Sequence, residues 1–335
     1  MLQRNNVPGC RMRPFRRAVL RIPLALLAAP ALARAQPAWS PSQPVRVLIP
    51  FPAGGTMDPV VRIAQQAVQE DLGQPVVIDY RPGGATVVGT TELQRAAPDG
   101  HTLLMVANSF AANITLRPNT PYNALRDFAP LVLATVVPHV LVANPAVARD
   151  FPGFLEAGRK PGGGLTYGSY GIGTSNHLGG DQFKGLARLN AIHVPYTGTT
   201  QAYPDLTSGR LDFMFANLPD VLQPVAAGQL RALAISAEAR AKELPNLPTM
   251  AELGFPLVLS DSWFGLICRA EVPAPARARL EAAWRAALLR PDIRGRLEEQ
   301  AFTVLAKPGE DFGADIRRYA RTYAEVIQAN GIKVE

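Results

Sequence analysis

Cysteine is scarce in this sequence, with Cys10 and Cys268 as its two representatives among 335 residues. Cys10 lies in an N-terminal segment that we expect to be removed, which leaves Cys268 alone. An intrachain disulfide is therefore excluded. Cys268 ends the apolar run 263–268, and an isolated thiol in such a run is typical of packed core rather than of a nucleophile.

Histidine is scarce as well. His101, His139, His177 and His193 are too far apart in the sequence to show the ligand spacing of a metal site. A lone histidine is more typical of a hydrogen-bonded structural position. We therefore expect no metal site, and no residue pattern selects a catalytic triad.

Motifs for phosphate and dinucleotide binding are incomplete. Gly83, Gly84 and Gly89 form a glycine loop, but it lacks the Gly-Lys-Ser/Thr ending of a phosphate loop. Gly171 and Gly173 match the opening of a dinucleotide fingerprint, whose third glycine position is Asn176 here. We expect no nucleotide and no other cofactor.

The longest apolar stretch of the N-terminus, residues 22–32, is far shorter than the roughly 20 residues that span a bilayer. It follows a basic opening and precedes the small-x-small site 33–35, which is typical of a cleavable export signal. We expect cleavage after Ala35. The general secretory route is favoured, and the pair Arg16-Arg17 leaves the twin-arginine route as an alternative.

The basic character of the chain belongs to this signal. Residues 1–35 carry seven arginines and no acidic residue, so the rest of the chain has 27 basic and 27 acidic residues. Its net charge is zero. A nucleic-acid partner is therefore not indicated.

The sequence does contain a predicted strand that is followed by a glycine loop and then by the start of a helix. The apolar run 45–49 predicts a buried strand, and Gly54 and Gly55 leave backbone N–H groups uncovered. Asp58 followed by proline predicts a helix start with Asp58 as N-cap. Such a corner favours an anion, because free N–H groups and the helix dipole both point at it. The alternative is an ordinary βα turn.

The stretch 168–177 repeats this arrangement. It follows a predicted strand, precedes a predicted helix, and could bind an anion through Ser169, Thr174 and Ser175. A serine-rich N-cap without a ligand is the alternative. For hydrolysis, Ser169 and Ser175 are the candidate nucleophiles, although neither lies in G-x-S-x-G.

Strand and helix patterns alternate along the chain, which favours an α/β architecture with mainly parallel sheets. About 300 residues usually exceed one compact core, so we expect two lobes. From Pro273 onward the sequence reads as helical. The predicted strands are 45–49, 75–79, 102–107, 131–137, 140–144, 165–168, 192–196, 211–215, 232–236 and 263–267.

The ordered motifs of the chain resemble those of the substrate-binding proteins of tripartite tricarboxylate transporters, also called Bug receptors. Each motif is weak alone, but their order and spacing are specific. Tyr80, Gly84-Ala85, Thr197 and Gln201 depart from the usual pattern. The matching segments are PFPAGGTMDPVVR (50–62), LGQPVVIDYRPGG (72–84), AAPDGHTLL (96–104), DFAPL (127–131), TYGSYGIGTSNHLGGDQF (166–183), HVPYTGT (193–199), LRALAISAEAR (230–240) and LPNLPTMAELGFP (244–256).

The resemblance implies a two-lobed type II periplasmic binding protein fold that closes around a small carboxylate. The first lobe would comprise residues 36–138 and 258–335, the second residues 139–257, with hinges near Val137 and Val258. The implied ligand-binding residues are Phe51, Ala53, Gly54, Gly55, Thr56 and Asp58 in the first loop, Ser169, Gly171, Gly173, Ser175 and His177 in the second loop, and Asn108, Ser109, Tyr196 and Asn217 at strand ends.

The resemblance also implies a function. We expect a monomeric, non-enzymatic periplasmic receptor that captures a small organic acid and delivers it to a membrane transporter of the tripartite tricarboxylate type. Two alternatives stay open: a ligand-responsive signalling protein without its own transporter, and a secreted serine hydrolase that uses Ser169 or Ser175. Dicarboxylates, tricarboxylates, amino acids, aromatic acids and nicotinate-like acids all fit such a site.

Overall fold

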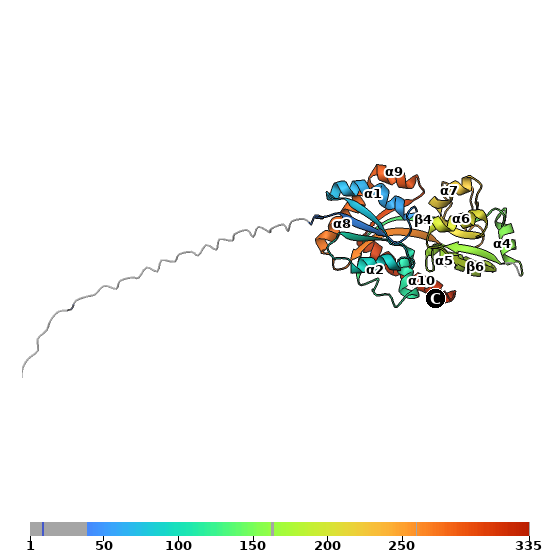
Figure 1. The fold of residues 1–335 in the computed structure, drawn as a ribbon, viewed down its shortest axis with the longest axis horizontal. Coiled ribbons are helices and arrows are strands. Elements are labelled where there is room, and N and C mark those ends of the chain that lie inside the picture. The colour runs from blue at the N-terminus through green and yellow to red at the C-terminus, as the bar shows by residue number, and fades with distance from the viewer. Residues whose placement is uncertain (1–8, 10–38, 162–163, 259, 335) are drawn as a thin grey trace, which may run out of the picture. The chain divides into compact units, whose positions relative to one another are not determined.

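The computed structural model describes Gly9 and residues 39–161, 164–258 and 260–334. The chain divides into residues 1–37 and a compact unit of residues 38–335. The expected signal at 1–35 and its cleavage site therefore lie outside the described residues, apart from Gly9. All elements below belong to the compact unit (Figure 1).

The strands are β1 (Val45–Ile49), β2 (Val76–Tyr80), β3 (Thr102–Val106), β4 (Phe128–Ala143), β5 (Leu165–Ser169), β6 (Ala191–Pro195), β7 (Phe213–Asn217), β8 (Arg231–Ser236), β9 (Asp261–Arg269) and β10 (Thr303–Pro308). The helices are α1 (Met57–Leu72), α2 (Val87–Arg95), α3 (Asn108–Leu116), α4 (Phe151–Arg159), α5 (Ser175–Ala187), α6 (Thr199–Ser208), α7 (Leu218–Ala226), α8 (Ala274–Leu289), α9 (Pro291–Glu298) and α10 (Gly309–Ala329).

One sheet runs through the unit in the order β2-β1-β3-β9-β4-β7-β5-β6, and β8 and β10 also pair with β4. β1 is parallel to β2 and β3, and β5 is parallel to β6 and β7, as predicted. Every pairing of β4 and β9 is antiparallel. The sheet is therefore mixed rather than mainly parallel, because these two strands run against the outer ones.

β4 divides the sheet into two parts. We call β1–β3, β9, β10, α1–α3 and α8–α10 the first lobe, and β5–β8 with α4–α7 the second lobe. The sequence predicted two strands, 131–137 and 140–144, where the structure has one 16-residue strand. Up to Pro138 this strand pairs with β9, and from His139 it pairs with β7 and β8. A proline has no N–H to donate, which suits the point where a strand changes partners.

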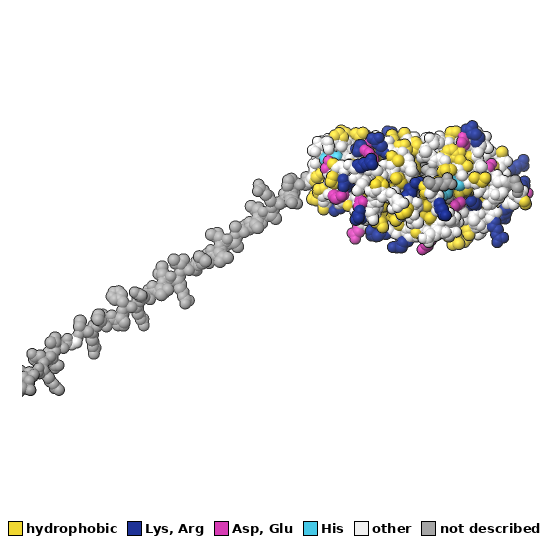
Figure 2. Space-filling model, turned by 60° about the horizontal axis from the view of Figure 1, so that its bottom comes forward, with side chains coloured by type: hydrophobic (Ala, Val, Ile, Leu, Met, Phe, Trp, Pro, Cys, Tyr) yellow, Lys and Arg dark blue, Asp and Glu magenta, His cyan; other side chains and the backbone are white. Residues whose placement is uncertain are grey.

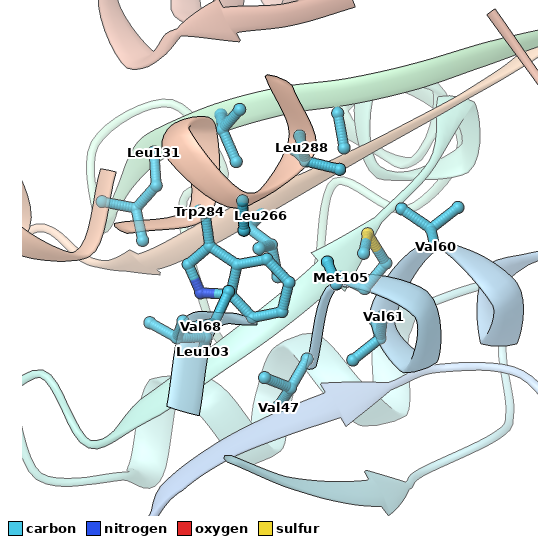
Figure 3. Close-up of a cluster of buried hydrophobic side chains, with 14 of the residues drawn as sticks. Val47, Val60, Val61, Val68, Leu103, Met105, Leu131, Leu266, Trp284 and Leu288 are labelled. Carbon is cyan, nitrogen blue, oxygen red and sulfur yellow. The ribbon is translucent and has the colours of Figure 1, made fainter. Parts of the chain in front are cut away.

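The first lobe has a hydrophobic core on each face of its sheet. On one face, buried side chains of α1, α8 and α9 recur every three or four residues and pack on β1, β3, β4 and β9. Figure 3 shows Trp284 of α8 within this core, near Val68 and Leu103. On the other face, α2, α3 and α10 cover the sheet, with Phe110 and Phe312 buried against it.

The second lobe is also built in three layers. Phe154 of α4 and Phe183 of α5 pack on one face of its sheet, with Phe154 and Phe213 edge to face at a centroid distance of 5.0 Å. α6 and α7 cover the other face through Leu206 and Val221. Figure 1 shows α6 and α7 on the opposite side of these strands from α5.

The predicted strands agree with the observed ones to within two residues at most ends, but β10 was missed. The sequence from Pro273 was read as helical, and that reading is wrong at Thr303–Pro308. β10 has a register shift between Val304 and Lys307, and Ala306 has a φ of 45°. This irregularity interrupts the alternation by which a strand is recognised.

A further contact joins the lobes away from β4. The end of α10 packs near α3 and α5, where Ala112, Leu178, Ile327 and Ile332 form a small buried cluster. The described part of the chain contains no helix long and apolar enough to cross a membrane.

Figure 2 shows basic and acidic side chains interspersed on the visible face. The lobe boundaries 36–138 plus 258–335 and 139–257 stay a prediction.

Candidate functional site

A cavity of about 40 Å³ lies between the lobes, at the carboxyl ends of β1, β3, β5, β6 and β7. In open α/β sheets this is the edge where ligands bind, because the loops there lead from strands into helix N-termini. The lining residues are Phe51, Pro52, Gly55, Thr56, Met57, Ala107, Asn108, Ser109, Tyr170, Thr174, Ser175, Asn176, Gly198, Thr199, Asn217, Ser262 and Phe264.

Five helices begin at this cavity. The N-cap positions of α1, α3, α5, α6 and α7 are Thr56, Ala107, Thr174, Gly198 and Asn217, and all of them line it. None of these N-cap side chains makes a capping hydrogen bond. The positive ends of five helix dipoles thus meet in one place, and no lining residue carries a charge. Such an arrangement favours an anion held without a cationic side chain.

The first glycine loop differs from its prediction at Asp58. α1 begins at Met57 with Thr56 as N-cap, so Asp58 lies in the first turn and is not the cap. Its Oδ2 accepts hydrogen bonds from the Gly54 N–H (2.8 Å) and the Tyr80 hydroxyl (2.9 Å). Arg62 donates to that same Tyr80 hydroxyl (2.7 Å). Asp58 therefore fixes the loop from behind and does not line the cavity.

Thr56 connects the two lobes. The Asn217 amide donates to Thr56 Oγ1 (2.6 Å), which donates to Asp220 Oδ2 (2.6 Å). Asp220 lies in the first turn of α7, and Tyr170 and Thr199 also donate to its Oδ2 at 3.4 and 3.5 Å. Burial raises the pKa of Asp220 to about 6, and the hydrogen bonds partly offset this effect. An acidic group thus lies directly behind the lining hydroxyls.

The α3 side of the cavity is held by Asn108. Its side chain donates to the Tyr323 hydroxyl of α10 (2.6 Å) and accepts from the Trp263 N–H of β9 (3.0 Å). Ser109, the next residue, is 1% exposed, and its Oγ has no hydrogen-bond partner. A buried hydroxyl without a partner is unusual and costs free energy, so its place on the cavity wall makes it a candidate ligand contact.

The second loop presents amide and hydroxyl groups. Thr174 Oγ1 donates to Gly171 O and lies 2.6 Å from Asn176 Oδ1. The Asn176 Nδ2 is buried and has no partner. Ser175 Oγ lies 3.3 Å from Ser262 Oγ of β9. The Oδ1 of Asn217, at the end of β7, also lacks a partner. The wall therefore offers unpaired donors and acceptors to a polar molecule.

Ser169 and His177 support the second loop from outside the cavity. Ser169 Oγ lies 2.7 Å from His193 Nε2, and the His193 ring stacks on His177 at a centroid distance of 3.9 Å. His177 Nδ1 accepts from the Gly173 N–H (3.2 Å). Burial lowers the pKa of His177 to about 4 and that of His193 to about 3.

The Ser169–His193 pair resembles part of a catalytic triad. Ser169 is fully buried, however, and within the described residues no carboxylate makes a hydrogen bond to His193. Ser175, the other predicted nucleophile, contacts Ser262 rather than a histidine. Neither serine therefore has the base and orienting group that acyl transfer requires.

The structure brings about half of the predicted site residues to the cavity wall. Ala53 and Gly54 are exposed, Asp58, Ser169, Gly173 and His177 lie behind the wall, and Gly171 and Tyr196 line a neighbouring cleft. Those on the wall are Phe51, Gly55, Thr56, Asn108, Ser109, Ser175 and Asn217.

Several wall residues were not predicted, among them Tyr170, Asn176, Thr199 and Ser262. Thr199 follows Gly198 at a strand-to-helix junction, and this signal would have identified it. Ser262 lies on β9, far along the chain, and no local pattern marks it. In the described part of the chain, no three His, Cys, Asp or Glu residues gather as a metal ion would require.

Comparisons with known proteins agree with this geometry. Residues 60–332 match the model of the TctC family, the tripartite tricarboxylate transporter family receptor. Protein BugT of Bordetella pertussis is 36% identical over 230 residues, which cover 68% of this chain and 71% of BugT.

Solved structures are similar over nearly the whole compact unit. MatC from Rhodopseudomonas palustris with bound malate has a TM-score of 0.79 and 27% identity, covering 86% of this chain and 99% of MatC. R. palustris Rpa4515 with adipate has a TM-score of 0.83 and 26% identity, covering 88% of this chain and 99% of that protein. The predicted family and two-lobed α/β fold are thereby confirmed. The chain belongs to the TctC family of tripartite tricarboxylate transporter receptors, which are periplasmic solute-binding proteins.

Proposed function

We propose that this protein is a monomeric periplasmic receptor that binds a small organic acid between its lobes and delivers it to a tripartite tricarboxylate-type membrane transporter. The observation that carries the proposal is the convergence of five helix N-termini on one uncharged interlobe cavity. Backbone N–H groups and neutral side chains there would hold a carboxylate. The acids bound by MatC and Rpa4515 support this ligand class.

Binding would favour the closed arrangement of the lobes. Thr56 of the first lobe and Asn217 of the second are hydrogen-bonded to each other on the cavity wall. A ligand that contacts both sides is bound more tightly when the lobes are together, and its differential affinity shifts the population toward closure.

The first test is a thermal-shift screen of residues 36–335 against small organic acids, amino acids and neutral analogues. A ligand at about 100 times its dissociation constant adds about 2.7 kcal/mol of stability. We expect a selective shift by one class of acid. If every acid and amino acid fails with folded protein, and mass spectrometry of the denatured protein finds no co-purified acid, the receptor proposal is wrong.

Ser109→Ala tests whether this cavity is the binding site. The hydroxyl lines the cavity without a partner, so its removal should leave the unliganded protein as stable as before. We expect binding of the acid found in the screen to be weaker by about 10- to 150-fold, because a hydrogen bond to a charged group contributes about 1.5–3 kcal/mol. Calorimetric titration measures the change.

The matched control for this variant is Ser208→Ala at the exposed end of α6, which should bind like the wild type. Unchanged affinity in Ser109→Ala would place the ligand elsewhere. Uptake of the labelled acid by cells that lack this gene, with and without the restored gene, tests delivery to a transporter. Equal uptake in both would favour a signalling role.

A further inference from the structure

A second cleft adjoins the candidate cavity. It has a volume of about 220 Å³ and lies between the β2–α2 loop of the first lobe and two loops of the second lobe, at 170–172 and 195–197. Phe51 and Tyr170 line both the cleft and the cavity. The two spaces are therefore neighbours that share these rings.

Arg117 is the charged residue of this cleft, since every other lining residue is uncharged. It directly follows α3, and its Nε is buried without a hydrogen-bond partner. Within the described residues its side chain makes no ion pair. Its positive charge lowers the pKa of Tyr122, which burial raises. A guanidinium in this position has donors free for an anion.

The surrounding structure holds Arg117 and the β2–α2 loop together. Asn113 accepts from the Arg117 N–H through its backbone carbonyl (2.9 Å), and its side-chain amide donates to the Ala85 carbonyl (2.7 Å). Ala85 and Thr86 have φ values of 45° and 82°, a backbone conformation that costs non-glycine residues free energy. The neighbouring structure must therefore impose this conformation on the loop.

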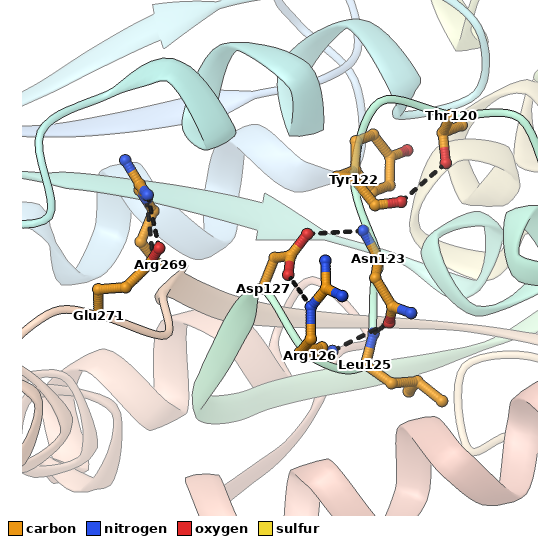
Figure 4. A network of polar contacts seen from close by, with 8 residues as sticks. All are labelled: Thr120, Tyr122, Asn123, Leu125, Arg126, Asp127, Arg269 and Glu271. Atoms are coloured by element: carbon orange, nitrogen blue, oxygen red, sulfur yellow. Dashed lines mark hydrogen bonds and ion pairs between the residues drawn. The ribbon is translucent and has the colours of Figure 1, made fainter.

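The segment that follows Arg117 is also fixed. Thr120 donates to the Tyr122 carbonyl (3.1 Å), and Asp127 accepts from the Asn123 N–H (2.7 Å) and from Arg126 (2.6 Å). Figure 4 shows this network around the turn. The backbone on both sides of Arg117 is thus held by hydrogen bonds, since the Arg117 N–H donates to the Asn113 carbonyl (2.9 Å) and the Arg117 carbonyl accepts from the Thr120 N–H (3.2 Å).

We propose that Arg117 forms a second anion subsite, so that the ligand of this receptor is a dicarboxylate. One carboxylate would occupy the uncharged cavity among the helix N-termini, and the other would pair with Arg117 in the cleft. The methylene chain would pass Phe51 and Tyr170, whose rings border both spaces. This inference rests on the proposed function and names the ligand class of the same site.

The physical reason is charge. A second carboxylate taken out of water needs an opposite charge or several hydrogen bonds, and the guanidinium can supply both in a bidentate contact. The cavity itself has no cationic side chain and has Asp220 behind its wall. Arg117 lines the neighbouring cleft and is therefore the group that would distinguish a dianion from a monoanion.

The experiment measures the affinities of linear dicarboxylates from succinate to suberate, each beside the monocarboxylate of equal chain length. The proteins are the wild type, Arg117→Gln and Arg117→Lys. The control is Arg149→Gln, an exposed arginine outside both spaces. We expect the wild type and the control to prefer a dicarboxylate. Arg117→Gln should bind it about tenfold more weakly and bind the monocarboxylate as before.

Arg117→Lys should fall between the two, because it keeps the charge and loses the bidentate geometry. It also serves as the test if the glutamine variant does not fold. Equal losses for both members of a pair, or no loss, would overturn the subsite. Wild-type binding of monocarboxylates alone would overturn it and leave the proposed function intact, whereas no binding of any acid would contradict the proposed function itself.

Discussion

Asp220 lies behind the wall of the candidate site, and the fold alters its ionisation. Burial raises its pKa from 3.8 to about 6, so the folded protein holds this proton more tightly than the unfolded chain does. The stabilisation is complete below the unfolded value and is lost as the pH rises through the folded value. Its full size is about 3 kcal/mol at most.

Asp220→Asn isolates this effect. We expect the unfolding free energy of the wild type, relative to the variant, to increase as the pH falls from about 7 to about 4. Urea denaturation of both proteins at several pH values measures the difference. A difference that does not change with pH would mean that Asp220 is not perturbed in the folded protein.

Site residues that directly follow a strand could be predicted from the sequence. Contacts between residues of different lobes could not be predicted. Gly55, Thr56 and Ser175 lie at strand-to-helix junctions that the sequence marks with glycine, threonine and serine. Thr56 and Asp220 are 164 residues apart, and no local pattern pairs them. The N-cap role of Asp58 was wrong because the helix begins two residues earlier than predicted, with Thr56 as N-cap.

At the scale of elements, α5 packs closely on the chain segment that leads into β9. A Cβ added to Gly179 would lie 2.5 Å from Ser260 Oγ and 2.7 Å from Ser260 Cβ. Ser260 in turn donates to the Ser175 carbonyl at the start of the same helix (3.0 Å). The helix therefore approaches this segment where only glycine fits.

Gly179→Ala should destabilise the protein by about 1–3 kcal/mol, the usual cost of overpacking a filled interior. Gly185→Ala is the matched control on the same helix, because its added Cβ would meet only Asn330 Oδ1 at 3.6 Å. Alanine is the better helix former, so this control should be as stable as the wild type or gain up to about 1 kcal/mol. Thermal unfolding compares the two. Equal stability of both variants would show that α5 is free to move away from Ser260.

The elements of the outer strands and helices could be predicted because their apolar runs and helical periodicity are regular. β4 was read as two strands since Pro138 interrupts its pattern, and β10 was missed since its register shifts between Val304 and Lys307. Both errors arise where long-range pairing determines the strand. Sequence periodicity carries no information about that pairing.

At the scale of the whole molecule, buried histidines make the fold sensitive to acid. His139 of β4 is fully buried between the Ser260 and Ser262 hydroxyls, at 2.8 and 2.9 Å. Burial lowers its pKa from 6.5 to about 3, and the pKa values of His177 and His193 are lowered as well. The unfolded chain therefore binds more protons below pH 6.5, and stability is lost as the pH falls through this range.

We expect His139 alone to lower the unfolding free energy by about 2 kcal/mol at about pH 5 relative to neutral pH. His139→Gln should remove this part of the pH dependence, whatever its cost at neutral pH, because glutamine does not titrate. Denaturation at both pH values checks the expectation. Equal slopes for the two proteins would mean that His139 is protonated without opening the structure.

The path of β4 and β9 has a consequence for how the chain matures. The core around α1 combines Val45 and Val61 with Phe264 of β9 and Trp284 of α8, so the first lobe cannot close before these later residues have emerged. The second lobe, in contrast, has all its elements between residues 128 and 236. As the chain emerges from its N-terminus, the second lobe would thus be complete before the first, whose core waits for Phe264 and Trp284.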